Sequence, residues 1–163
     1  MPTNAYASQA DLETGLGGPS VLLQLADFGN TGSLADVGVQ AVIVDYLETG
    51  AARVRAAAEV KHDPETLDAL DTASKRLLVA WNVDLSVRIA WEKGARGQAV
   101  PQRVAERAER TERDLDRLAD GHLRLGRVAG GTVAAINQPA ESRDPDPDLT
   151  GLSINAFRAT GFR

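Results

Sequence analysis

The chain has 163 residues, a formal net charge of -5 and no cysteine. This length provides one domain with a real hydrophobic core, and the missing cysteines exclude disulfides, thiolate zinc sites and a cysteine nucleophile. The acidic balance argues against a dedicated nucleic-acid binder held by phosphate neutralisation. No apolar run approaches the roughly 18 residues that cross a bilayer, and the first residues lack the pattern of a signal peptide, so we expect a soluble protein.

Charge is unevenly distributed along the chain. Residues 1–50 contain six acidic residues and no Lys or Arg, which gives this segment a charge of -6, whereas the remainder is near neutral. In a ring of identical subunits, this asymmetry would concentrate negative potential on one surface. Such a surface would matter for contact with a basic neighbour or with DNA.

Two short helices are predicted near the start of the chain. Ser8 can cap the first helix, with Asp11 in its first turn, and Gly17 provides a stop. The second helix, over residues 19–27, opens with a proline, and the Gly- and Asn-containing stretch 28–33 predicts a loop.

A longer helix is predicted over residues 34–60, with Ser33 as its cap and Asp36 in its first turn. Its apolar residues occupy more than one face, whereas an amphipathic helix in a monomer should show one apolar stripe. We therefore expect part of this helix to contact a second subunit. The residues expected at this contact are Val39, Val42 and Tyr46.

The helix expected to form the spine of the fold covers residues 64–93. Asp63 is its predicted cap and Pro64 its first helical residue, and a glycine follows its end. A broad apolar stripe runs along it and includes Trp81, which is predicted to lie in the core. Trp91, near the end of the helix, suits either the core or an interface with another subunit.

One acidic residue interrupts the apolar part of this spine. An unpaired carboxylate at Asp84 would be costly there, so we expect it to pair with a nearby Arg such as Arg88, one helical turn later.

A fourth helix, over residues 101–120, carries arginines at three- and four-residue steps, interleaved with acidic residues. The arginines are Arg103, Arg107, Arg110, Arg113 and Arg117. The pattern favours a solvated face with many ion pairs, and the alternative is a surface that binds nucleic acid or a regulator. Together these helices predict an all-α fold, a small bundle of about four helices with one long central helix.

The sequence divides into a helical domain, residues 1–136, and an extended C-terminal linker and docking arm, residues 137–163. The linker is rich in Pro and Asp, and a short apolar segment follows it. That segment is too short to fold alone, so we expect the arm to be disordered in the free subunit and ordered on a partner. Its apolar residues are Leu152, Ile154, Phe157 and Phe162.

Residues for catalysis or metal binding are sparse. The chain has two histidines, His62 and His122, and neither has a metal-ligand spacing. The segment from Asp27 to Asp36 has some features of a calcium loop but lacks the alternating oxygen ligands and the final Glu. We therefore expect no enzymatic activity, no cofactor and no metal.

The order of these elements resembles a known family. The opening Tyr6–Leu12, the stretch Gln24–Asp27 and the closing sequence LDRLADGHLRLG at 115–126 are similar to the Mu-like tailed-phage head-tail connector family of adaptor and head-completion proteins. The resemblance covers roughly residues 6–126. The chain departs from it at 51–64, where the family often has Arg-Tyr followed by Leu-Pro, and in a longer tail.

The resemblance implies an all-helical adaptor that oligomerises beneath the portal, commonly as a ring of twelve subunits, and joins the capsid to the tail. Its partners would be other copies of itself, the portal protein and a tail-side stopper or tail terminator protein. DNA would pass through the lumen without specific binding, and the protein would reside in the virion, assembled in the host cytoplasm. The apolar arm would dock on the portal, and the family offers no catalytic site to transfer.

Overall fold

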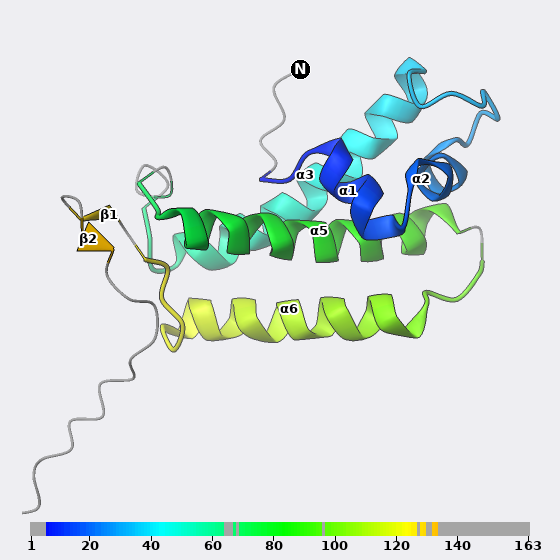
Figure 1. Ribbon diagram of the computed structural model, residues 1–163. Helices are drawn as coiled ribbons and strands as arrows, with labels where there is room; N and C mark the ends of the chain where they lie inside the picture. The colour runs from blue at the N-terminus through cyan, green and yellow to red at the C-terminus, as the bar shows by residue number, and fades with distance from the viewer. Residues whose placement is uncertain are drawn as a thin grey trace, which may run out of the picture.

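A computed structural model describes residues 6–63, 67, 69–95 and 97–126, together with the backbone of residues 128–129 and 132–133 (Figure 1). This part of the chain is all-α, as predicted. Its helices are α1 (Gln9–Leu16), α2 (Pro19–Ala26), α3 (Val37–Glu59), α5 (Thr72–Gly94) and α6 (Gln102–Asp120). Two strands of two residues each, β1 (Val128–Ala129) and β2 (Thr132–Val133), pair antiparallel after the last helix.

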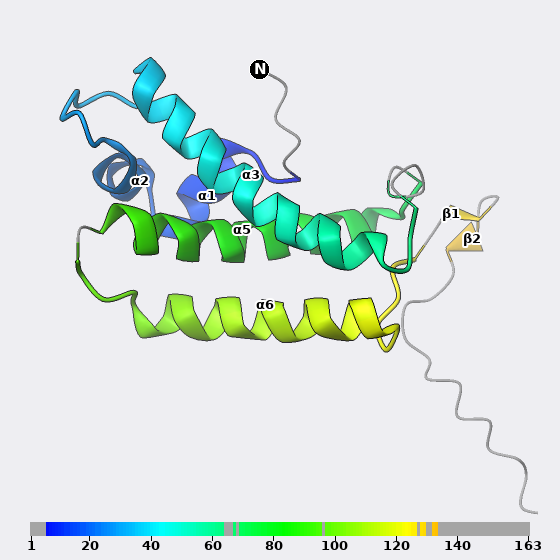
Figure 2. The ribbon, with the colours of Figure 1, turned by 180° about the vertical axis from the view of Figure 1, so that it is seen from behind.

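Helix α5 is the central element, and it contacts each of the other four helices named above. Helices α5 and α6 lie side by side and antiparallel, while α3 crosses α5 and also touches α6 (Figures 1 and 2). Helices α1 and α2 pack on α5 and α3. The predicted spine is therefore the spine of the fold, although its boundaries differ from the prediction.

Several helix ends lie where the sequence places them. Ser8 and Asp11 form a reciprocal capping box at α1, with the Asp11 carboxylate accepting from the Ser8 backbone N–H at 2.8 Å. Gly17 and Gly121 end α1 and α6 in the left-handed conformation, with φ of 92° and 84°. Glycine adopts this conformation without the steric cost that a Cβ would bring, which explains both stops.

The structure corrects the cap of α3 and the extent of the predicted spine helix. Helix α3 is capped by Asp36, not Ser33, because the Asp36 carboxylate accepts from the N–H groups of Gly38 and Val39 at 2.8 and 3.2 Å. Helix α5 begins at Thr72 with Asp71 as its cap, so the predicted helix 64–93 is not continuous. Its predicted first residue, Pro64, lies outside the described residues, and Leu67 is helical.

The start of α5 is set by contacts that lie far away in sequence. The Asp71 carboxylate accepts from the N–H of Ser74 at 2.6 Å. The Asp71 N–H donates to the carbonyl of Gly126 at 3.0 Å, and the Gly126 N–H donates to the Ser74 hydroxyl at 2.9 Å. The chain after α6 therefore returns to the first turn of α5 and fixes where that helix begins.

The core consists of two apolar clusters that follow one another along α3 and α5. The first contains residues of α1 and α2, the first half of α3 and the second half of α5. The second contains the remaining halves of α3 and α5 together with α6 and residues around it. Trp81 belongs to the second cluster and is buried, as predicted.

A small polar layer lies in the interface of α3 and α5. Asn82 and Ser86 of α5 are fully buried, and the Ser86 hydroxyl donates to Asn82 Oδ1 at 3.1 Å. Asn82 Nδ2 is buried and has no hydrogen-bond partner. Opposite them, a Cβ on Gly50 of α3 would stand 2.5 Å from Ser86 Oγ and 2.7 Å from Asn82 Oδ1, so only glycine fits this approach.

A second close approach joins α5 to α2. A Cβ on Gly94 would lie 2.2 Å from the carbonyl oxygen of Leu25. The same carbonyl accepts a hydrogen bond of 2.9 Å from the hydroxyl of Tyr46 in α3. Leu25 is thus the point at which α2, α3 and α5 are held together.

Candidate functional site

The residues expected at a contact between subunits lie in the chain's own core. Val39 and Tyr46 are 3% and 1% exposed. Val42 and Trp91 are partly buried against the same cluster. Helix α3 has apolar residues on several faces because α1, α2, α5 and α6 all contact it. The pattern that suggested a second subunit is therefore accounted for within the chain, and Val39 and Tyr46 leave almost no surface for a neighbour.

Burial of Tyr46 leads to a testable pH dependence. Burial, reinforced by the nearby charge of Asp45, raises the pKa of Tyr46 to about 12. Because folding raises this pKa, the protonated hydroxyl contributes roughly 2 to 3 kcal/mol to the free energy of unfolding. The contribution is fully present below the ordinary tyrosine pKa near 10, and it is lost as the pH rises through 12. Tyr46→Phe removes this dependence together with the hydrogen bond to Leu25.

We expect Tyr46→Phe to be about 1 kcal/mol less stable than the wild type at pH 8, where the hydrogen bond decides the difference. The difference should shrink and then reverse between pH 10 and 12. Urea unfolding of both proteins across this range measures it, and a difference that stays constant with pH would contradict the assignment.

Asp84 of α5 forms its ion pair with a residue of a neighbouring helix rather than with a residue of α5. Arg107 of α6 donates to the Asp84 carboxylate, and the hydroxyl of Thr111 donates to its other oxygen at 3.2 Å. The predicted partner, Arg88, instead binds Glu92 at 2.7 Å and Glu112 at 3.3 Å. The carboxylate faces α6, so its compensation comes from that helix, which the sequence alone does not place.

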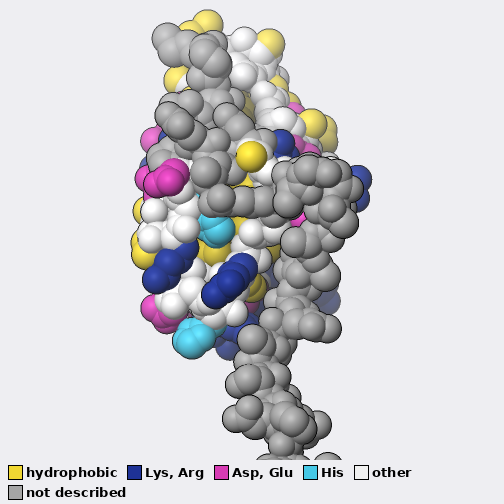
Figure 3. Space-filling model, turned by 90° about the vertical axis from the view of Figure 1, so that its left-hand side faces the viewer, with side chains coloured by type: hydrophobic (Ala, Val, Ile, Leu, Met, Phe, Trp, Pro, Cys, Tyr) yellow, Lys and Arg dark blue, Asp and Glu magenta, His cyan; other side chains and the backbone are white. Residues whose placement is uncertain are grey.

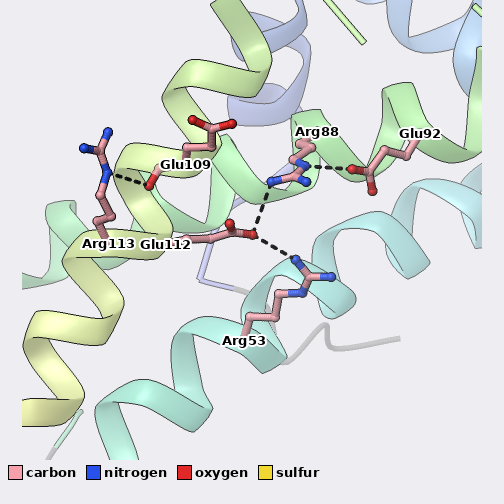
Figure 4. Close-up of polar contacts among 6 residues, drawn as sticks. All are labelled: Arg53, Arg88, Glu92, Glu109, Glu112 and Arg113. Atoms are coloured by element: carbon pink, nitrogen blue, oxygen red, sulfur yellow. Dashed lines mark hydrogen bonds and ion pairs between the residues drawn. The ribbon is translucent and has the colours of Figure 1, made fainter. Parts of the chain in front are cut away.

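The charged face of α6 forms ion pairs in part, and most of them join α6 to other helices rather than lying within it. Glu112 accepts from Arg88 and Arg53, which joins α6 to α5 and α3, and Arg113 donates to the backbone carbonyl of Glu109 (Figure 4). Arg117 lies 3.8 Å from Asp114. Because these pairs are partly exposed, each contributes little to stability. Of the arginines of α6, Arg107 and Arg117 pair with carboxylates, whereas Arg103, Arg110 and Arg113 have no ion pair with a described residue. The nucleic-acid alternative therefore keeps three cations on this helix.

One hollow of about 380 Å³ lies between α2, the loop after it and the end of α5. Its wall includes Ser20, Gln24, Asp27, Asn30, Ala95 and Gln98. The Asp27 carboxylate accepts from the N–H groups of Thr31 and Gly32 at 2.9 and 2.7 Å, and these bonds hold its pKa below the usual value. The hollow therefore has an ionised carboxylate in its wall.

Exposed apolar side chains lie at both ends of α3. Val37, in its first turn, is 84% exposed, and Val60, just after its last turn, is 60% exposed. Phe28, in the loop before α3, is 47% exposed. The end of the molecule that contains Val60 also presents basic, acidic and histidine side chains (Figure 3). These three apolar residues are better placed to meet a neighbour than the residues predicted from the sequence.

The two histidines and the arm residues are the remaining candidates from the sequence. His62 is half-buried and His122 is exposed. Within the part of the chain that the structure describes, no three His, Asp or Glu side chains are grouped to hold a metal ion. No helix among these residues is long and apolar enough to span a bilayer. The arm residues Leu152, Ile154, Phe157 and Phe162 lie outside the described residues.

No protein-family model, curated protein or solved structure matches this chain.

Sequence reasoning missed the close approach at Gly94, the polar layer at Asn82 and the hollow beside Asp27. Asn82 and Ser86, four residues apart in an otherwise apolar stretch, were a visible signal for the polar layer. The hollow had no such signal, because its wall combines α2 with the end of α5, segments that are about seventy residues apart.

Proposed function

We propose that this protein is a structural, non-enzymatic subunit of a tailed-phage virion, a head-tail connector that forms a ring beneath the portal. The ring would join the capsid to the tail-side proteins around the DNA channel. The proposal starts from the resemblance to the Mu-like connector family, and the all-helical fold is compatible with it.

One observation supports the proposal: each of the three sequence pieces on which the resemblance rests lies at a junction between helices. The Tyr6–Leu12 piece contains the capping box of α1. The Gln24–Asp27 piece ends α2 and braces the loop through Asp27. The closing piece ends α6 at Gly121 and binds the first turn of α5 through Gly126. Junction residues decide how helices meet, so similarity at these positions supports a shared architecture.

The exposed ends of α3 supply a candidate contact for the ring. A head-to-tail interface joins two different patches and closes into a ring when the rotation permits. Val37 and Val60 lie at opposite ends of a helix of 23 residues, about 34 Å apart along its axis. We propose that the Val37 end of one subunit meets the Val60 end of the next.

The test is the mass of the assembly in solution, measured for the full-length protein alone and with the portal of the same particle. We expect a monomer alone and a ring on the portal. Val37→Asp and Val60→Asp should each prevent the ring, because a charge would be buried in the contact. Ala52→Asp, on an exposed position of the same helix, is the matched control.

Two outcomes would count against the proposal. A protein that stays monomeric on the portal is not an adaptor of this kind. Salt-dependent DNA binding by the isolated protein, lost on substitution of Arg103 and Arg110, would favour the nucleic-acid alternative.

A further inference from the structure

The hollow beside Asp27 is suited to a cationic group next to an apolar one. It lies where α2 and α5 both end, at Ala26 and Gly94. The last carbonyls of a helix lack partners within the helix and carry partial negative charge, so two helix ends together favour a cation. The ionised carboxylate of Asp27 adds to this potential, and the described residues of the wall include no Lys or Arg.

Apolar surface accompanies the polar atoms. Leu23 and Ala95 contribute to the wall, and Phe28, 47% exposed, follows Asp27 directly in the chain. Lys93, the basic residue of α5 that is nearest to the wall in sequence, is engaged elsewhere, since its ammonium lies 2.7 Å from Asp45. Arg96, between the wall residues Ala95 and Gln98, lies outside the described residues. The described wall therefore combines negative potential with carbon surface.

The chain contains a segment with the matching chemistry. Residues 149–163 include Arg158 and Arg163 and no acidic residue, and each arginine directly follows a phenylalanine. The first fifty residues, which supply α2 and Asp27, contain no Lys or Arg. The acidic start of the sequence and its basic, apolar end are thus complementary in charge.

The geometry also permits the segment to reach the hollow of its own chain. Gly126 lies at the first turn of α5 and the hollow at its last, about 34 Å away for 23 residues. Beyond the paired strands β1 and β2, the 15 residues from 134 to 148 have a typical end-to-end distance of roughly 21 Å and an extended reach of about 50 Å. A tether of this length gives its end an effective concentration near the millimolar range, well above that of other copies in dilute solution.

We propose that the hollow receives the chain's own residues 149–163, with the Arg158 guanidinium beside Asp27 and the Phe157 ring against Leu23 and Ala95. In the isolated subunit this docked state replaces the unattached arm expected from the sequence. It covers the apolar arm until a partner competes for it. The inference does not rest on the proposed function, because it concerns the isolated subunit alone.

The test uses the absence of cysteine in the wild-type chain. Full-length protein with Gln98→Cys at the hollow and Ala159→Cys in the arm is oxidised at micromolar concentration. The control pairs Ala159→Cys with Lys75→Cys, an exposed residue at the start of α5. Lys75 lies nearer to Gly126 than the hollow does, so an undocked arm would cross-link there at least as fast. We expect the hollow pair to form its disulfide within one chain about tenfold faster.

Arg158→Gln in the hollow pair should remove this advantage, while Arg143→Gln, in the linker, should leave it unchanged. Circular dichroism of each variant verifies that the helices are intact. Equal rates for the two cysteine pairs would overturn the proposal. So would a rate that rises with protein concentration and yields linked dimers, because the occupant would then be the arm of a second copy. Neither result depends on the portal, so this experiment tests the docking proposal independently of the ring proposal.

Discussion

Gly94→Ala is expected to destabilise the protein by about 3 kcal/mol or more, at the upper end of what overpacking costs. The added Cβ would lie 2.2 Å from the Leu25 carbonyl oxygen and 2.9 Å from two further backbone atoms of that residue. A flexible side chain could move aside, but backbone atoms of α2 cannot without displacing the helix. The same movement would stretch the hydrogen bond from Tyr46, so α2 would separate from both α3 and α5.

Urea unfolding measures this loss, and Gly29→Ala provides the matched control. A Cβ on Gly29 would meet its nearest atom, in the Thr31 side chain, at 3.5 Å, an ordinary contact. We expect the control to change the free energy of unfolding by less than about 0.5 kcal/mol. Similar stability of Gly94→Ala and the control would show that α2 does not pack on α5 in this way.

Asn82→Asp is expected to cost about 3 kcal/mol or more at pH 7. The substitution keeps the shape of the side chain but places a carboxylate in a fully buried position between α3 and α5. Only the Ser86 hydroxyl is placed to donate to it, and no cation is recorded beside it among the described residues. A buried charge without a partner is among the most costly changes in a protein interior.

The loss should depend on pH in a defined direction. Burial disfavours the charged form, so the pKa of the new carboxyl is raised above its ordinary value near 4 in the folded state. The folded variant therefore binds this proton more strongly than the unfolded chain does. Its loss of unfolding free energy relative to the wild type is small near pH 4 and grows as the pH rises. Asn30→Asp, in the exposed loop after α2, is the isosteric control. If Asn82→Asp lowered the free energy of unfolding equally at pH 4 and pH 7, residue 82 would be exposed to solvent rather than buried.

Local sequence signals predicted the fold class and several helix ends correctly. The Ser8 cap, the stop at Gly17 and the end of the fourth helix at residue 120 depend on residues close in sequence, and they lie as predicted. The start of α5 was missed because its cap, Asp71, is selected by contacts with Gly126, 55 residues later. Asp63 and Pro64 carried a local signal for a helix start, and Pro64 lies outside the described residues.

The candidate site was harder to predict for the same reason. Periodicity shows which residues of α3 are apolar, but it does not show how many neighbours will cover them. Val39 and Tyr46 were therefore assigned to a contact between subunits, although helices of the same chain bury them. Asp84 was correctly expected to need a cation, yet the cation came from Arg107 on another helix. The chemistry of a residue is readable from sequence, whereas its partner depends on the fold.

The pair of hydrogen bonds at Gly126 has a mechanical consequence. Gly126 accepts from Asp71 and donates to Ser74, so the chain is fastened to the first turn of the central helix immediately before residues 127–163 begin. Tension applied through those residues would first load this fastening, and through it α5, before it could unwind α6 from its C-terminal end. A pull on the tail of one subunit would thus be borne by the helix that touches α1, α2, α3 and α6, which spreads the force across the whole domain.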